Sequence, residues 1–594
     1  MSHALLRFTD AGPSPVPVLA VRFRDALSAA FGRGYAGIDP VIRWSRHADL
    51  QADVAIALAK HLGGTPSDVA KEIVRHLRVE DLVSEVQVGE KGYINLTLSN
   101  AWIIEQVRRI SGDRRLLVPL AVQPERVVVE YSSPNVGKVM HAGHLRTTIV
   151  GDAIARILGH LGHDVVRDNH IGDWGTPFGM LIEYLHDFDG GIDAGLDAFA
   201  NDTGAFYKAA HALFEWDEEF AGRARRRLVD LQAGDEETLR YWRLLVHVSM
   251  DSFRPLYERL GVQLTDDDVK GESFYKEILP EVVDELQDIR LAEVSEGALC
   301  VFLPEFTGRD GGPKPVIVRK SDGGYNYMTT DLATILHRID VEGAQRVVYV
   351  VGDEQTEHFK QLFAVAQMAH MVPPGVVLQH AKIGLVADPR TGGRLRSRSG
   401  EAGRLTELLE RAHERAAAAF DKSGRGRRFD AATRAAIVRD VALGAVKFAD
   451  LRVPRSSRYS FDLDRMIAFN GESAGFLQYA GVRMRSLLRR GGLTPESAPA
   501  PITIGTGEER ALALHLLDFG ITLKEAGAAA EPHRLARYLY RLATLFTAFY
   551  GACGVFKAGI DEETRASRLA LCAVALRTLD TGLDLLGVPA PERM

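Results

Sequence analysis

Apolar residues change their spacing along the chain, and these changes predict its structural units. Val127 to Val129 form a short apolar run that is typical of a buried strand. Farther on, apolar side chains recur at every fourth position, the spacing of one helix face: Leu145, Ile149, Ala153, Ile157 and Leu161. Val165 and Val166 then begin a second strand. This order predicts a βαβ unit of a doubly wound sheet, whose first loop lies where open α/β sheets bind ligands.

The segment before this unit predicts a small α+β domain over residues 1–112. Its candidate helices occupy 17–31 and 50–78. Residues 92–99 alternate between apolar and polar side chains, as a half-buried strand does. A separate N-terminal domain is therefore expected in front of the sheet.

The sheet domain is expected to be Rossmann-like and to cover residues 113–404. A charged and wholly helical pattern at about 189–290 predicts an insertion into it, and apolar runs at 315–319 and 346–351 predict that strands return afterwards. From 405 to 594 the pattern is helical almost throughout, which predicts an all-α stem and C-terminal domain. The expected fold class is thus multidomain α/β, with a doubly wound domain between an α+β domain and a helical one.

Composition narrows the class of protein. The 594 residues are 46% apolar and 25% charged, as in globular proteins with large cores. Three cysteines lie far apart without C-x-x-C spacing, so neither a disulfide framework nor a cysteine-based zinc site is expected. No stretch has membrane-spanning length and no signal-peptide pattern begins the chain, so we expect a cytoplasmic protein without a membrane partner. The net charge of −7 does not decide whether RNA is bound, because local patches and shape govern that association.

The most informative motif lies in the loop between the first strand and its helix. It ends in His141-x-Gly143-His144, so two imidazoles and a glycine stand where unpaired N–H groups and the helix dipole favour a polyphosphate. Two histidines that merely cap an ordinary helix are the alternative. The polar residues at 132–135 and Lys138 favour the nucleotide site.

A second motif is a loop that places cations between small residues at Arg396, Ser397 and Arg398. Such a loop can close over a triphosphate and neutralise the charge of a leaving pyrophosphate. In isolation it would be an exposed basic loop.

A third motif places Tyr327 and Asp331 four positions apart, on one face of a helical turn. An aromatic wall beside a carboxylate suits a guanidinium group, which can stack on the ring and donate to the acid. The alternative is a tyrosine and an aspartate at an ordinary helix start.

Together these motifs resemble the arginyl-tRNA synthetases, a family of class I, and the resemblance extends over nearly the whole chain. The H-x-G-H spacing after a strand is similar to that of class I aminoacyl-tRNA synthetases and related nucleotidyltransferases. The resembling segments are 130–152, 169–185, 322–338, 347–359, 395–400, 475–490 and 585–594.

The resemblance implies a pocket for free arginine. Glu130 and Asn135 match residues that hold the α-amino group and neighbouring atoms. Tyr327 and Asp331 match residues that receive the guanidinium group, and Gln355 matches a further side chain of that pocket.

It also implies sites for ATP and tRNA. The matching ATP-binding positions are His141, Gly143, His144, His358, Arg396, Ser397 and Arg398. The N-terminal domain resembles one that contacts the tRNA elbow, and the C-terminal helices resemble an anticodon-binding domain. On those helices, Gln478, Tyr479 and Arg483 occupy matching positions.

Two positions depart from the family pattern. Ala142 replaces the usual isoleucine of the first motif, and Arg398 replaces the usual lysine of the second. In family members without that lysine, a lysine before the first motif is thought to compensate, and Lys138 occupies that place. The catalytic residues implied by the resemblance are therefore His141, His144, Lys138 and Arg398.

The implied activity is ATP-dependent activation of L-arginine and its transfer to the 3′ end of tRNA(Arg). Mg²⁺ is expected with ATP, no protein-bound metal is expected, and the chain is expected to act as a monomer. Two rival interpretations remain: an H-x-G-H adenylyltransferase that activates a small substrate without tRNA, and a tRNA-binding relative without catalysis. The helical C-terminal third argues against the first, since such an enzyme needs no RNA-reading surface. Chemically competent residues at every motif position argue against the second.

Overall fold

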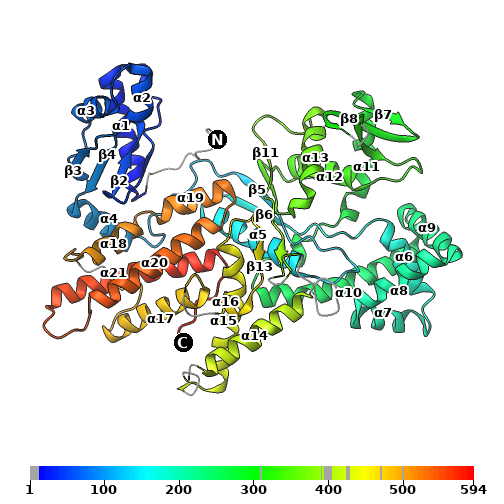
Figure 1. Cartoon of the computed structure of the whole chain (residues 1–594). Helices are drawn as coiled ribbons and strands as arrows, with labels where there is room; N and C mark the ends of the chain where they lie inside the picture. The colour runs from blue at the N-terminus through cyan, green and yellow to red at the C-terminus, as the bar shows by residue number, and fades with distance from the viewer. Residues whose placement is uncertain are drawn as a thin grey trace.

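The chain folds into an N-terminal domain, an α/β domain that contains a helical insertion, and a C-terminal group of helices (Figure 1). A small N-terminal domain packs beside the C-terminal helices, the α/β domain lies in the centre, and a helical insertion occupies the opposite end. The computed structural model describes residues 12–307, 311–388, 391–393, 404–422, 424, 428–467, 471–497 and 501–594.

The N-terminal domain is an antiparallel sheet of order β1-β2-β4-β3 packed against helices. Its strands are β1 (Ile42–Trp44), β2 (Leu50–Ala52), β3 (Val83–Val88) and β4 (Ile94–Leu98). Its helices are α1 (Pro15–Phe31), η1 (Arg33–Tyr35), α2 (Val54–Leu62) and α3 (Pro66–His76), and α4 (Asn100–Gly112) leads to the next domain. The predicted helix at 17–31 and strand at 92–99 are confirmed as α1 and β4.

The predicted single helix at 50–78 is wrong. Residues 50–52 form β2, because Leu50 and Ala52 pair with β4 and bury their side chains in the sheet core. The remainder is two helices, since Gly63 adopts a left-handed conformation with φ of 71° that ends α2. The Thr65 hydroxyl then accepts a hydrogen bond from the Asp68 amide, which caps α3.

The central sheet has four parallel strands in the order β11-β10-β5-β6. They are β5 (Arg126–Glu130), β6 (Asp164–Asp168), β10 (Arg346–Tyr349) and β11 (Val377–His380), and they are connected by helices that include α5 (Ala142–His160) and α13 (Thr356–Met368). The chain leaves β5 towards β6 and later returns on its other side as β10. Glu130 therefore ends β5 at the point where the strand order reverses, which is where such sheets bind ligands.

The insertion is built from five helices that pack on one another. They are α6 (Thr176–His186), α7 (Gly191–Asn201), α8 (Thr203–Trp216), α9 (Glu218–Ala233) and α10 (Glu236–Leu260). The short turns η2 (Asp266–Asp268) and η3 (Glu272–Ile278) follow and bring the chain back to the sheet. The predicted helical insertion is thus present. The helix α11 (Leu279–Asp288), which the prediction included in it, does not pack with these five helices but belongs to a second hydrophobic core.

A second core surrounds α11 and a three-stranded antiparallel sheet of order β7-β8-β9. Its elements are β7 (Ala292–Ser295), β8 (Ala298–Thr307), β9 (Pro313–Arg319), α12 (Tyr327–Leu336) and the π-helical turn η4 (His337–Val341). The apolar run at 315–319 is a strand as predicted. It belongs to this separate sheet, however, because its partner across the ladder is β8.

The C-terminal part is a group of helices joined to the α/β domain by a short parallel pair of strands. The helices are α14 (Leu405–Lys422), α15 (Ala431–Leu451), α16 (Leu463–Met466), α17 (Ala474–Arg490), α18 (Gly507–Leu516), α19 (Phe519–Ala529), α20 (His533–Ala552) and α21 (Glu562–Leu585). The paired strands are β12 (Val386–Ala387) and β13 (Tyr459–Ser460).

Two arginine side chains fasten these parts together. Arg146 of α5 is completely buried; its Nε donates to Asp450 of α15 at 2.7 Å, and its Nη1 donates to the carbonyl oxygens of Gly384 and Ser457. Arg510 of α18 makes two hydrogen bonds of 2.7 Å with Asp49 of the N-terminal domain. Both ends of the chain are thus attached through charge-assisted bonds.

Candidate active site

The two histidines of the first motif cap α5 through one ring nitrogen each. His141 Nδ1 accepts a hydrogen bond of 3.0 Å from the Gly143 amide, and His144 Nδ1 accepts one of 3.1 Å from the His141 amide. Their rings stack with centroids 4.1 Å apart. Both histidines therefore cap the helix, each through Nδ1. Because Nδ1 is the acceptor, the neutral ring of each histidine carries its proton on Nε2.

Burial keeps His144 neutral. The pKa of His144 is lowered to about 3, first by burial and then by the charges of His141 and Lys138. Gly143 has a geometric role here, since a Cβ at that position would lie 2.9 Å from Cε1 of His141. The stacked His141 ring therefore occupies the space beside the Cα of Gly143.

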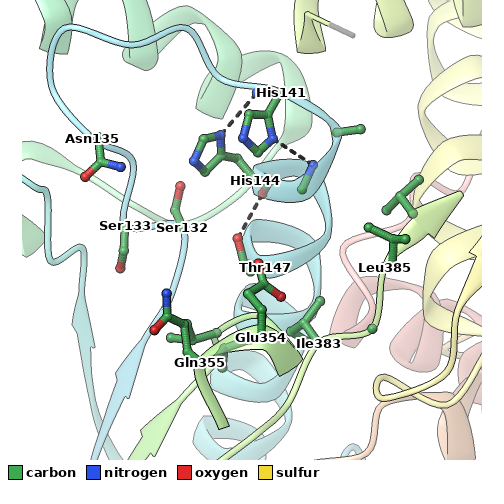
Figure 2. A pocket seen from close by; sticks show the side chains of 17 residues that line it. Ser132, Ser133, Asn135, His141, His144, Thr147, Glu354, Gln355, Ile383 and Leu385 are labelled. Atoms are coloured by element: carbon green, nitrogen blue, oxygen red, sulfur yellow. Dashed lines mark hydrogen bonds between the residues drawn. The ribbon is translucent and has the colours of Figure 1, made fainter. Parts of the chain in front are cut away.

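A cavity of about 280 Å³ opens beside these histidines, at the carboxyl ends of β5 and β10 (Figure 2). It brings together five of the residues predicted from the sequence: Asn135, His141, Gly143, His144 and Gln355. Ser132, from the polar segment 132–135 noted in the sequence, also lines it, as do Thr147 and Glu354, which the sequence did not single out. Residues 383–386 form the opposite wall. The cavity thus joins the helix N-terminus to the switch point of the sheet.

The backbone beside this cavity is strained. Ser132 and Ser133 have φ values of 71° and 48°, a conformation that side chains other than glycine seldom adopt. Hydrogen bonds hold the segment in place, because the Ser132 hydroxyl bonds Tyr257 at 2.8 Å and the Ser133 amide donates to Asn169 at 3.1 Å. Such strain is commonly kept where a loop serves a ligand.

A second group of predicted residues surrounds Asp331. Its carboxylate lies 2.6 Å from Nε2 of His358, and the ring of Tyr327 meets the His358 ring edge-on at 5.0 Å. Tyr327 is 64% exposed, so one side of its ring remains open to solvent. His358, which the resemblance places near the nucleotide, therefore contacts the expected guanidinium pocket.

Glu272 of η3 is a site residue that the sequence did not indicate. It lines a cavity of about 530 Å³ together with Trp174 and Tyr327. Burial, helped by the charges of Asp331 and Asp173, raises the pKa of Glu272 to about 7. The available signal was weak: a Gly-Glu pair follows the helical insertion. Gly271 is required there, since a Cβ would lie 2.5 Å from Asp173.

Glu130 lies below this pocket, buried at the end of β5. Its Oε2 is 2.7 Å from Nη2 of Arg338, which also contacts Asp168 at 3.0 Å. Burial raises the pKa of Glu130, and the Arg338 charge opposes that shift. The sequence identified Glu130 but not Arg338.

Lys138 lies on the insertion side of the site. Lys138 is exposed, with Nζ 5.3 Å from the ring centroid of Tyr207 of α8. Arg396, Ser397 and Arg398 lie outside the described residues. The chain that follows them returns beside the histidines, because the Leu405 amide donates to the Met140 carbonyl at 2.9 Å.

Comparison with known proteins identifies the family. The profile for the class I tRNA synthetase (R) catalytic domain matches residues 106–463, and those for the DALR anticodon binding domain and the arginyl tRNA synthetase N terminal domain match 477–594 and 18–98. An arginine–tRNA ligase of Thermobifida fusca is 52% identical and covers 98% of this chain and 100% of its own length. The chain belongs to the arginyl-tRNA synthetase family. A relative of the same name from Frankia casuarinae is 45% identical, over 96% of this chain and 97% of its own.

Solved arginyl-tRNA synthetases share the whole architecture. The Plasmodium falciparum enzyme superposes with a TM-score of 0.81 at 25% identity, covering 98% of this chain and 99% of its own. The Thermus thermophilus enzyme superposes with a TM-score of 0.78 at 25% identity, covering 98% and 100%. The predicted fold class, family and class of enzyme, an aminoacyl-tRNA ligase, are thereby confirmed.

The C-terminal positions predicted to bind tRNA divide into two kinds. Gln478 is 1% exposed, and its amide donates to the carbonyl oxygens of Asp440 and Pro589, so it holds α17 against its neighbours and is closed to RNA. Arg483, in contrast, lies 4.6 and 4.7 Å from the ring centroids of Tyr479 and Tyr550. In this arginyl-tRNA synthetase family member, these three side chains form a cation–aromatic platform on α17 and α20.

Within the part of the chain that the structure describes, no helix is long and apolar enough to cross a membrane. Among the same residues, one group of side chains lies close enough together to hold a metal ion: Glu183, His186 and Asp187. Arg223 forms ion pairs with both carboxylates of this group.

Proposed function

We propose that this arginine–tRNA ligase binds ATP in the cavity beside the motif histidines and arginine beside the cavity that Glu272 and Tyr327 line. Arginine is activated between them. The arginine carboxylate attacks the α-phosphorus of MgATP, which forms arginyl-adenylate and releases pyrophosphate. The terminal ribose hydroxyl of tRNA(Arg) then attacks the carbonyl carbon, and AMP leaves. The observation that supports this assignment is the histidine-capped start of α5, which borders the first cavity. The buried acid Glu130 ends β5, at whose carboxyl end this cavity lies.

The first motif is proposed to bind the phosphates of ATP. His141 and His144 use Nδ1 for the helix, so Nε2–H of each is the donor that can reach phosphate oxygens. The α5 N-terminus adds its dipole. Donors fixed in this way stabilise the charge that develops on the phosphates in the transition state. Mg²⁺ is expected to enter with ATP, bound to its phosphates.

Carboxylates are proposed to bind the two cationic groups of the arginine substrate. Glu130 is proposed to accept the α-ammonium group, with Asn135 beside it, while Asp331 and Glu272 receive the guanidinium and Tyr327 stacks on it. The shared environment of Asp331 and Glu272 supports this division, since the negative charge of Asp331 raises the pKa of Glu272. A bound guanidinium would oppose that repulsion and favour the charged form of Glu272.

The tRNA is proposed to contact both ends of the molecule. The platform of Tyr479, Arg483 and Tyr550 offers a ring and a cation on which an unpaired base can stack. The N-terminal domain, proposed as residues 1–112, would meet the tRNA elbow, and the helical region from 405 onward would carry the anticodon contacts. A monomer and a cytoplasmic setting stay predictions.

The test is ATP–pyrophosphate exchange measured with and without arginine and tRNA(Arg). A ligase whose arginine pocket is completed by tRNA exchanges only when both are present. Exchange that needs no tRNA would favour the small-molecule adenylyltransferase, and the absence of any exchange would favour a tRNA-binding protein without catalysis. Lysine in place of arginine is the matched substrate control, because it has the charge but not the planar fork.

A further inference from the structure

Arg338 joins the substrate-binding helix to the ends of two sheet strands. It lies on η4, the π-helical turn that continues α12, and its side chain is 0% exposed. Tyr327 and Asp331 stand on the same helix. Irregular π turns inside α-helices occur frequently at functional sites.

The contacts of Arg338 are specific. Nη2 lies 2.7 Å from Oε2 of Glu130 and 3.0 Å from Oδ2 of Asp168, and Nε lies 3.2 Å from the same Asp168 oxygen. The guanidinium carbon is 5.2 Å from the ring centroid of Tyr349. Because Glu130, Asp168 and Tyr349 are paired end residues of adjacent strands, one cation reaches all three strand ends.

Glu130 makes unequal use of its two oxygens. Oε2 is paired with Arg338, whereas Oε1 has no hydrogen bond or ion pair among the described residues. A carboxylate anchored through one oxygen presents the other in a fixed direction. That arrangement suits an acceptor awaiting a cationic substrate group.

The charges around Glu130 show why an anchor is needed. Asp168 and Asp331 raise its pKa by repulsion, in addition to the larger effect of burial, while Arg338 and His170 lower it. His170 is itself buried, but Glu130 raises its pKa above the usual value. Arg338 is the permanent cation of this group, because a guanidinium does not lose its proton in the physiological range.

On the basis of the proposed role of Glu130, we propose that Arg338 is a positioning residue that holds the Glu130 carboxylate charged and oriented for the α-ammonium group of arginine. Without it, a buried carboxyl group between other acids would take up a proton, and a neutral acid is a poor partner for an ammonium group. Arg338 does not touch the substrate; it acts through Glu130.

The experiment compares Arg338→Gln and Arg338→Lys with the unaltered protein. The KM values for arginine and ATP are measured in tRNA-dependent exchange from pH 6.5 to 8.5. For Arg338→Gln we expect the arginine KM at pH 6.5 to rise severalfold relative to the unaltered protein, because loss of the Arg338 charge favours the protonated form of Glu130. We expect this ratio to shrink as the pH increases and Glu130 regains its charge. Arg338→Lys should restore most of the affinity, and the ATP KM should stay within about twofold.

A merely structural role for Arg338 predicts a different result. Loss of packing would raise the KM values for arginine and ATP together, by a factor independent of pH, and either outcome overturns the proposal. If Arg338→Gln does not fold, the double variant with Asp168→Asn removes one charge of each sign from the core. That variant should show the same pH-dependent arginine KM, and a pH-independent KM in it also overturns the proposal.

A further variant separates this inference from the function on which it rests. Glu130→Gln should raise the arginine KM at every pH, with no recovery at pH 8.5. An unchanged KM in Glu130→Gln would refute the proposed role of Glu130 itself. A raised KM in Glu130→Gln beside an unchanged KM in Arg338→Gln would refute only the positioning role.

Discussion

Single residues of the site serve the fold and the chemistry with different atoms. Each motif histidine gives Nδ1 to the start of α5, and Nε2–H is the atom that we propose donates to ATP. This division can be tested, because asparagine is a strong helix cap that reproduces the acceptor but not the second nitrogen.

We predict that His141→Asn and His141→Ala both slow adenylate formation by about a hundredfold, the scale for one lost transition-state donor. Only His141→Ala should also lower the free energy of unfolding, by about 1 kcal/mol, because it removes the cap. Single-turnover adenylate formation and urea unfolding measure the two effects. Near-normal adenylate formation in His141→Asn would contradict the assigned role of Nε2.

Asp331 allows a second prediction at this scale. Replacing it by asparagine leaves a guanidinium poorly paired in a confined pocket, a penalty of about 2–5 kcal/mol for a buried charge pair. We expect Asp331→Asn to reduce kcat/KM for arginine accordingly, with the ATP KM nearly unchanged. Asp340→Asn, at an exposed carboxylate on the same helical run, is the matched control and should behave as the unaltered protein. Equal arginine kinetics in both variants would refute the guanidinium pocket.

Buried neutral histidines predict a pH-dependent stability. Burial lowers the pKa of His144 to about 3 and that of His515 to about 4, so both are neutral when folded. In the unfolded chain they take up protons below about pH 6.5. The free energy of unfolding should therefore fall as the pH drops from 6.5 towards 4. Urea unfolding should show a flatter slope for His515→Gln than for His47→Gln, an exposed control; identical slopes would contradict this.

Helices and strands were predictable from the sequence where the residues that determine them lie close together in the chain. The helix α5 and the strands β5 and β6 follow from spacing within a few turns, and they form as expected. The helix predicted at 50–78 failed because Leu50 pairs with Leu96 across the domain, although Gly63 and Thr65 did carry stop and start signals. Pairing between distant segments also decided which sheet contains β9.

The candidate site shows the same limit. Residues inside a contiguous motif, such as His141 and Gly143, were found directly. Glu272 and Arg338 were missed, because each gains its meaning only from partners on other elements that are far away in the chain. No spacing rule connects Arg338 with Glu130; the crossing of α12 over the ends of the sheet strands does.

The loop before α5 and helix α8 of the insertion meet at Lys138. Its Nζ lies over the Tyr207 ring, within reach of the motif that follows it. We predict that Lys138→Ala slows activation with only a modest change in ATP affinity, since the compact ammonium acts mainly on charge that appears in the transition state. A double-mutant cycle with Arg398→Ala, read by exchange rates, should be non-additive. A silent Lys138→Ala would refute the idea that Lys138 compensates for the replaced lysine.

Across the whole molecule, recognition is spread over distant surfaces while the net charge stays negative. RNA binding must then depend on local features such as the Tyr479, Arg483 and Tyr550 platform. We predict that Tyr550→Ala raises the KM for tRNA about fivefold or more, the lower range for losing one base-stacking contact, with arginine and ATP KM values unchanged. Trp216→Ala, at an exposed aromatic residue of the insertion at the other end of the molecule, is the control. An equal tRNA KM in both variants would exclude a role of this platform in tRNA binding.

The buried contact between Arg146 and Asp450 limits where this protein can be truncated. A fragment that ends before α14 would leave the Arg146 guanidinium inside the catalytic domain without its carboxylate and without the Ser457 carbonyl. An uncompensated buried charge of this kind is strongly destabilising, by about 3–5 kcal/mol. The catalytic domain alone should therefore be a poor minimal enzyme, and a gene truncated before α14 should yield an insoluble product rather than a slower catalyst.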